Sequence, residues 1–169
     1  VEGMMLMGAV SAFATALGTG NIWLAIIAGG VAGAMTGAVF ALFALGFATN
    51  QVATGLALTI FGTGLSGLVG APLVGHAIDG LPQLLIPVLS ELPVVGPFLF
   101  SLDIMAYLAF ALLAGVAWFL KRTRGGLVLR AVGDNHDSAH ALGYPVLRVR
   151  LLAVLFGGMM AGLGGAYLP

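Results

Sequence analysis

The sequence predicts an all-α fold, namely a polytopic bundle of transmembrane helices. Hydrophobic residues make up 60% of the 169 residues and charged residues only 7%, whereas a soluble domain carries roughly 25% charged residues. Too few charges therefore remain to cover a surface in water. Glycine is abundant, at 27 residues, and small residues let transmembrane helices approach closely. This composition excludes a soluble globular domain and also a disordered chain, which needs low hydrophobicity and high net charge.

Four apolar segments are each long enough to cross a bilayer, which takes about 20 helical residues. They are residues 21–47, 52–69, 104–120 and 151–168. A fifth segment, residues 4–17, is short for a crossing and is predicted to be a partial, tilted or re-entrant helix. None of these segments alternates with a period of two, so barrel strands are excluded. We treat residues 1–169 as one transmembrane domain, and we expect it to be an internal piece of a longer protein.

The charged residues predict the orientation of the helices. All six Lys and Arg residues lie between Lys121 and Arg150. The other long connection, residues 71–103, carries Asp79, Glu91 and Asp103 and no basic residue. The positive-inside rule therefore places loop 121–150 in the cytoplasm and loop 71–103 outside.

Small residues recur at helical spacing in three of the spans and predict close helix contacts. The favoured interpretation is ordinary bundle packing, and the alternative is a seam along which helices glide or gate. The three small-residue stripes are Gly29, Gly33, Gly37 and Ala41; Gly62, Ser66 and Gly70; and Gly158, Gly162 and Ala166.

Residues 135–142 are predicted to form a short helix within the basic loop. Asp134 or Asn135 can cap its start, and Asp137 places negative charge in its first turn. Gly143 and Pro145 follow as stop signals. Because two turns of helix are not stable alone, we expect this helix to fold against the end of the bundle or against a partner.

The sequence does not indicate catalytic or metal chemistry. His136 and His140 lie one turn apart beside Asp134 and Asp137, but no third ligand is evident, so no metal is expected. The phosphate-binding pattern Gly-x-x-x-x-Gly-Lys-[Ser/Thr] is missing, which makes nucleotide hydrolysis by this chain implausible. The spans hold no charge pairs, which disfavours a proton-driven carrier. A net charge of zero gives no basic face for nucleic acid, so the expected surroundings are a lipid bilayer.

Uncharged polar residues remain in and beside the spans, and one group follows the segment 52–69. Its members are predicted either to hydrogen-bond between helices, the favoured interpretation, or to line a path for a neutral solute such as a sugar or nucleoside. These candidates are Asn50, Gln51, Thr54, Thr59, Thr63 and Ser66, the last three on one helix face.

Three stretches of the chain resemble the permease subunits of bacterial ABC transporters of the branched-chain amino acid, ribose and nucleoside group. They are residues 1–9, 50–66 and 130–150, and the likeness is greatest to the nucleoside (simple-sugar) branch. The most specific stretch matches the family pattern Gly-x-Asn-x-x-x-Ala-x-x-x-Gly at Gly133, Asn135, Ala139 and Gly143.

The resemblance implies a subunit of an ATP-driven importer in the bacterial plasma (inner) membrane, moving nucleosides or related simple sugars. It implies a separate ATPase subunit that binds ATP and Mg, a second permease subunit (the same or different) and an external solute-binding protein. This chain itself is expected to be no enzyme and to bind no cofactor. The residues implied to couple to the ATPase are Gly133, Asp134, Asn135, His136, Asp137, Ala139, Leu142 and Gly143.

Two other functions remain open at the level of sequence. One is a secondary carrier or channel for a small neutral solute that needs no ATPase. The other is a structural membrane subunit of a larger complex. Members of the family are about twice as long as this chain, so this piece alone is not expected to transport.

Overall fold

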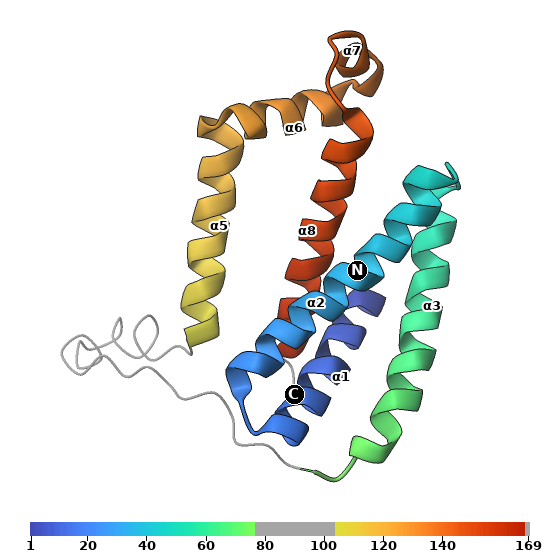
Figure 1. Cartoon of the computed structure of the whole chain (residues 1–169), viewed down its shortest axis with the longest axis vertical. Helices are drawn as coiled ribbons and strands as arrows, with labels where there is room; N and C mark the ends of the chain where they lie inside the picture. The colour runs from blue at the N-terminus through green and yellow to red at the C-terminus, as the bar shows by residue number, and fades with distance from the viewer. Residues whose placement is uncertain (77–103, 168–169) are drawn as a thin grey trace, which may run out of the picture. The chain divides into compact units, whose positions relative to one another are not determined.

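The computed structural model describes residues 1–76 and 104–167, and every regular element in these ranges is a helix. The all-α prediction is therefore confirmed. The chain divides into two compact units, one with α1, α2, α3, α7 and α8 and the other with α5 and most of α6 (Figure 1). The predicted loop 71–103 lies outside the described residues from position 77 onward, as do Leu168 and Pro169.

The helices of the first unit are α1 (Glu2–Thr19), α2 (Ile22–Ala41) with the π-helical turn η1 (Leu42–Gly46), α3 (Gln51–Gly70) with the 3-10 turn η2 (Ala71–Leu73), α7 (His136–Ala141) and α8 (Val146–Ala166). The second unit contains α5 (Ile104–Arg122) and residues 124–131 of α6 (Arg124–Asp134).

Among the described residues, four helices are long and apolar enough to cross a membrane: Ile22–Gly46, Gln51–Leu73, Ile104–Arg122 and Val146–Ala166. Each overlaps one predicted span, but Gln51–Leu73 runs four residues beyond the predicted end at residue 69, and the start of the last span also differs. Helix α8 begins at Val146, directly after Pro145, rather than at residue 151. Arg148 and Arg150 therefore lie on the first turns of α8 and not in a loop.

Helix α1 is longer than the predicted segment 4–17. It is one uninterrupted helix of 18 residues, which corresponds to roughly 27 Å at 1.5 Å per residue. It contacts α2, α3 and α8, and its buried face consists of Gly3, Met4, Gly8, Ala12 and Ala16. A helix surrounded by other helices does not need a long apolar run, and this explains why hydropathy alone underestimated α1.

Glycine contacts hold this bundle together at backbone distance. A Cβ atom placed on Gly33 of α2 would lie 2.6 Å from the Cα atom of Gly162 in α8. A Cβ atom on Gly62 of α3 would lie 2.6 Å from the Cα atom of Gly3 in α1. All three predicted small-residue stripes thus face neighbouring helices, as close packing requires, and the alternative of a gliding or gating seam stays a prediction.

The connection between α2 and α3 contains a feature that the sequence did not predict. The last turn after α2 is a π turn, and Ala48 follows with a φ of 49°. The Thr49 hydroxyl donates to the Phe43 carbonyl oxygen over 2.8 Å. A π turn adds one residue to a helical turn. The residues of this turn are as apolar as those of α2, so hydropathy predicts one continuous span and does not reveal the π turn.

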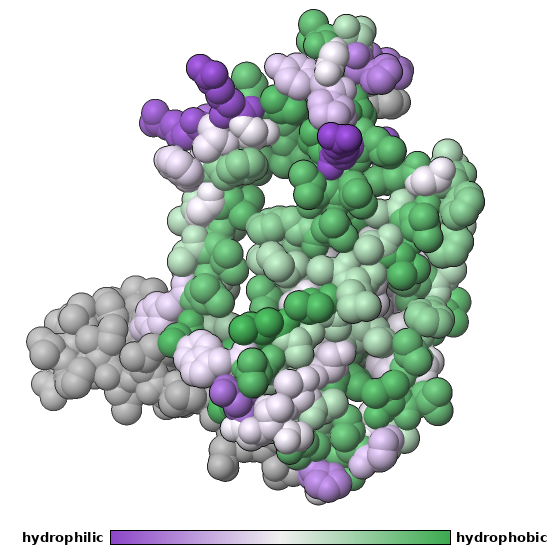
Figure 2. All heavy atoms as spheres, in the orientation of Figure 1, coloured by the Kyte–Doolittle hydropathy of each residue, from purple (hydrophilic) through white to green (hydrophobic). Residues whose placement is uncertain are grey.

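The outward-facing side chains of the helices are largely apolar. On α2, Trp23, Ile27, Val31 and Met35 are exposed, and α3 exposes a similar row of residues. Figure 2 shows hydrophobic residues over much of the visible helix surface and hydrophilic residues around α7. An exposed apolar surface of this extent is typical of helices that contact lipid or further protein.

Candidate functional site

Helix α7 is the candidate coupling element, and its start is fixed by a side-chain cap. Asn135 is extended, with a φ of −147°, and its Oδ1 accepts a hydrogen bond from the Ser138 amide at 3.0 Å. Asp137 lies in the first turn, where negative charge is favourable. Of the two predicted caps, Asn135 is therefore the correct one.

The end of α7 is fixed by a left-handed glycine. Gly143 has a φ of +84°, a region that residues with a Cβ atom rarely adopt. The Gly143 amide donates to the His140 carbonyl oxygen at 2.9 Å, and the Tyr144 amide donates to that of Ala139 at 3.2 Å. The helix begins one residue later and ends one residue earlier than the predicted range 135–142, since Asn135 and Leu142 are its caps.

One side of α7 is anchored and the other is open. Ala139 is only 3% exposed, and α7 contacts α8, which confirms that the short helix folds against the bundle. Leu142, by contrast, is 76% exposed, and Asp137 and His140 are also exposed. The anchored helix therefore presents a small surface of mixed polarity at the start of α8.

The two residues before the Asn135 cap lie in a helix and not in a loop. Gly133 and Asp134 belong to the last turn of α6. A glycine near a helix end costs only about 1 kcal/mol relative to alanine, so it does not have to stop the helix.

The structure does not describe the side chain of His136. Within the described ranges, no three His, Asp or Glu side chains come close enough together to hold a metal ion.

The polar residues along α3 mainly satisfy their own helix. Asn50 caps α3, because its Oδ1 accepts from the Val52 amide at 2.9 Å. The hydroxyls of Thr54, Thr59 and Thr63 donate to the carbonyl oxygens four residues earlier, at 2.8–3.0 Å. The Ser66 hydroxyl donates to the Thr63 carbonyl oxygen at 3.0 Å. Within the described residues these hydroxyls therefore donate inside their own helix, and hydrogen bonding to another helix stays a prediction.

These α3 residues do not converge on one point. They extend from the N-cap of α3 to Ser66, which is roughly 24 Å along the helix axis. Ser66 is buried on the side of α3 that contacts α1, whereas Asn50, Gln51 and Thr63 are exposed. Their place in a translocation path remains a prediction.

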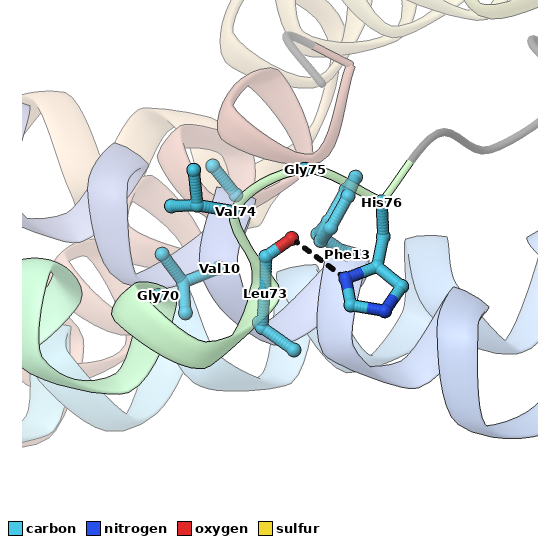
Figure 3. Close-up of a pocket in the computed structure, with 8 residues that line it drawn as sticks. Val10, Phe13, Gly70, Leu73, Val74, Gly75 and His76 are labelled. Carbon is cyan, nitrogen blue, oxygen red and sulfur yellow. Dashed lines mark hydrogen bonds between the residues drawn. The ribbon is translucent and has the colours of Figure 1, made fainter.

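A cavity of about 270 Å³ lies between α1 and the end of α3. Figure 3 shows Val10 and Phe13 of α1 facing the chain from Gly70 to His76. The Nδ1 atom of His76 lies 3.3 Å from the Leu73 carbonyl oxygen, and the other lining residues are apolar or glycine. No local sequence pattern indicates that α1 approaches His76.

The whole chain, residues 1–169, matches the family model described as branched-chain amino acid transport system permease component. It is 40% identical to the putative glucose ABC transporter permease protein TsgC13 of Haloferax volcanii, covering 99% of this chain and 52% of that protein. It is 30% identical to the guanosine ABC transporter permease protein NupQ of Bacillus subtilis, covering 98% and 56%.

A third relative is the nucleoside ABC transporter permease protein NupC of Lactococcus lactis, which is 28% identical and matches 98% of this chain and 56% of its own length. The chain thus spans about half the length of these relatives. No solved structure matches it significantly. Full coverage by the family model, together with the apolar helices, shows a multi-pass membrane protein, and the chain belongs to the permease family of branched-chain amino acid-type ABC transport systems.

Proposed function

We propose that the complete protein is the permease subunit of an ATP-driven ABC importer and that α7 is its contact with a separate ATPase subunit. The observation that carries this proposal is the construction of α7. Both of its ends are fixed, by the Asn135 cap and by Gly143; Ala139 is buried, and the helix contacts α8. A short helix held in this way moves as a rigid piece.

Motion of α7 has a direct route into the bundle. Only residues 142–145 separate it from α8, and α8 contacts both α1 and α2. Because these contacts join glycine backbones, a shift of α8 displaces helix axes and not merely flexible side chains. ATP binding on the ATPase would therefore change access to a path between helices by moving α7 and α8 together.

The remaining parts of the proposal concern surroundings and partners. The protein lies in a bacterial plasma membrane. The segment with α6 and α7 is on the cytoplasmic side, and residues 71–103 are on the outer side. A second permease subunit completes the path, an external solute-binding protein delivers the solute, and ATP and Mg bind to the ATPase. This chain supplies no catalytic group.

The proposed solutes are nucleosides or related simple sugars. The named relatives are permeases for guanosine, nucleosides and, putatively, glucose. All these solutes are neutral and rich in hydroxyl groups. The described spans offer uncharged polar side chains, which suit such solutes better than ions. A thermal-shift screen of the cognate binding protein with nucleosides and sugars would identify the solute, and no response to either class would contradict this assignment.

The coupling role is tested by changing the cap of α7 in the complete transporter, reconstituted with its ATPase. Asn135→Ala removes the acceptor for the Ser138 amide, a change that destabilises a helix start by about 1 kcal/mol. We expect solute uptake per ATP hydrolysed to fall severalfold. Gly143→Val, which opposes the left-handed backbone, should act in the same direction.

Two controls accompany this test. Asn135→Ser retains a capping oxygen and should keep most of the coupling. Gly64→Ala on α3, where a Cβ atom meets nothing within 4 Å, should leave uptake unchanged. Normal coupled uptake in Asn135→Ala and Gly143→Val would overturn the coupling role of α7, and uptake without any ATPase would instead support a secondary carrier or channel.

A further inference from the structure

The joint between α5 and α6 is built to hold α6 in one direction. The Thr123 hydroxyl donates to the Phe119 carbonyl oxygen at 2.7 Å and accepts from the Gly126 amide at 3.0 Å. It therefore ties the end of α5 to the start of α6. Gly126 is buried, and a Cβ atom there would lie 2.6 Å from the Cα atom of Leu120. Only glycine permits such an approach, so α6 crosses the end of α5 at close range (Figure 1).

The direction of α6 places it at the membrane surface. Helix α5 is apolar and long enough to span the bilayer, and a helix that crosses its end runs along the headgroup layer. Trp118 is 64% exposed in the last turns of α5. Exposed tryptophan is enriched at the level of the headgroups, which gives an independent mark of depth.

Helix α6 has the two-sided character of a helix at an interface. Gly126 and Val132 are buried, and Val128 and Leu129 are half-buried. At 100° per residue these four positions share one half of the helix. Arg124 and Arg130 are exposed on the opposite half, and the exposed Leu127 lies between them. An apolar face combined with basic residues is typical of helices that lie on anionic membranes.

Four cations gather at this joint: Lys121, Arg122, Arg124 and Arg130. All are exposed, and none forms an ion pair with another residue that the structure describes. The nearest acid along the chain is Asp134 at the end of α6, four residues after Arg130 and roughly 15 Å from Arg124 along the helix. Basic clusters next to a transmembrane helix attract anionic lipid headgroups.

We infer that the end of α5 and the helix α6 form a binding surface for anionic phospholipid headgroups. The four exposed basic side chains reach the surrounding phosphates, and the exposed Leu127 lies between Arg124 and Arg130 on the same half of α6. The inference needs α5 to span the membrane but does not depend on coupling to an ATPase. Lipid binding and coupled uptake are therefore measured separately, and a negative result for one does not contradict the other.

The test uses the complete transporter, assembled with its partner subunits, in vesicles of phosphatidylcholine and phosphatidylglycerol. All tryptophans except Trp118 are replaced by phenylalanine, and quenching of Trp118 is compared for brominated phosphatidylglycerol and brominated phosphatidylcholine. We expect stronger quenching by the anionic lipid, and we expect this preference to decrease with added salt. Arg124→Gln with Arg130→Gln should reduce the preference, by up to about fivefold for each charge removed.

The matched control is Arg124→Lys with Arg130→Lys, which keeps both charges and should keep the preference. Equal quenching by the two lipids in the unaltered transporter would overturn the inference. A preference that the glutamine variant retains in full would also overturn it. If the preference appears only when the partner subunits are absent, a protein and not lipid covers this surface, and the inference is wrong.

Discussion

At the scale of single residues, the bundle depends on the absence of side chains. Gly162 of α8 lies against Gly33 of α2 so closely that an added Cβ atom would be 2.8 Å from the Gly33 Cα atom. An added Cβ atom would meet backbone atoms, which cannot move aside as the end of a flexible side chain can. In a membrane, close backbone approach of this kind supplies van der Waals contact where the hydrophobic effect between helices is missing.

Gly162→Ala should therefore destabilise the protein. We expect a loss of about 1–3 kcal/mol, as for other overpacked positions, because α8 must move away from α2. Gly164→Ala on the same helix is the matched control, since a Cβ atom there meets nothing within 4 Å. Unfolding of the complete protein in mixed detergent micelles measures both changes, and equal stability of the two variants would contradict the contact.

At the scale of elements, local signals were reliable and contacts between distant segments were not visible. The ends of α7 could be predicted from Asn135 and Gly143 because caps act within a few residues. Helix α6 was not predicted, since residues 121–150 were treated as one basic loop with a single short helix at 135–142. The rigid joint that uses Gly126 is evident only when α5 is in place. The extent of α1 and the cavity beside His76 depend on packing between helices, which no single segment encodes.

Helix α3 allows the proposed solute path to be tested separately from stability. The Thr63 side chain is exposed, and its hydroxyl donates to the Thr59 carbonyl oxygen of the same helix. Thr63→Val should therefore change the free energy of unfolding by less than about 0.5 kcal/mol. If Thr63 lines the path, the solute concentration that gives half-maximal uptake should rise severalfold.

Thr36→Val on α2 is the matched control for this change. The Thr36 hydroxyl also donates to a carbonyl oxygen within its own helix, that of Gly33 at 2.9 Å, but it is not a path candidate. We expect normal uptake in this variant. Identical transport kinetics in the two variants would remove Thr63 from the path.

At the scale of the whole molecule, the pattern of charge and exposure predicts how the protein sits in the membrane. Exposed apolar residues follow the outer sides of the helices, and Leu142 projects beside α7 at the start of α8. If the positive-inside prediction is correct, Leu142 faces the cytoplasm and Ile27 faces the bilayer or further protein.

Cysteine labelling tests this orientation, since residues 1–169 contain no native cysteine. Any cysteine elsewhere in the complete protein is first replaced. Leu142→Cys should react with a membrane-impermeant maleimide in inside-out vesicles and not in intact cells. Ile27→Cys is the control and should resist this reagent in both. Reaction of Leu142→Cys in intact cells would reverse the proposed orientation.

The glycine contacts also set an order of assembly during synthesis. Gly33 and Gly37 of α2 pack on residues 154–162 of α8, which the ribosome adds long after α2 is made. Because chains are synthesised from the N-terminus, this side of α2 enters the membrane without its partner. Completion of α8 is therefore the event that closes the α1–α2–α8 core, and a nascent chain that stalls before Val154 leaves bare backbone of α2 open to lipid or to the quality-control machinery.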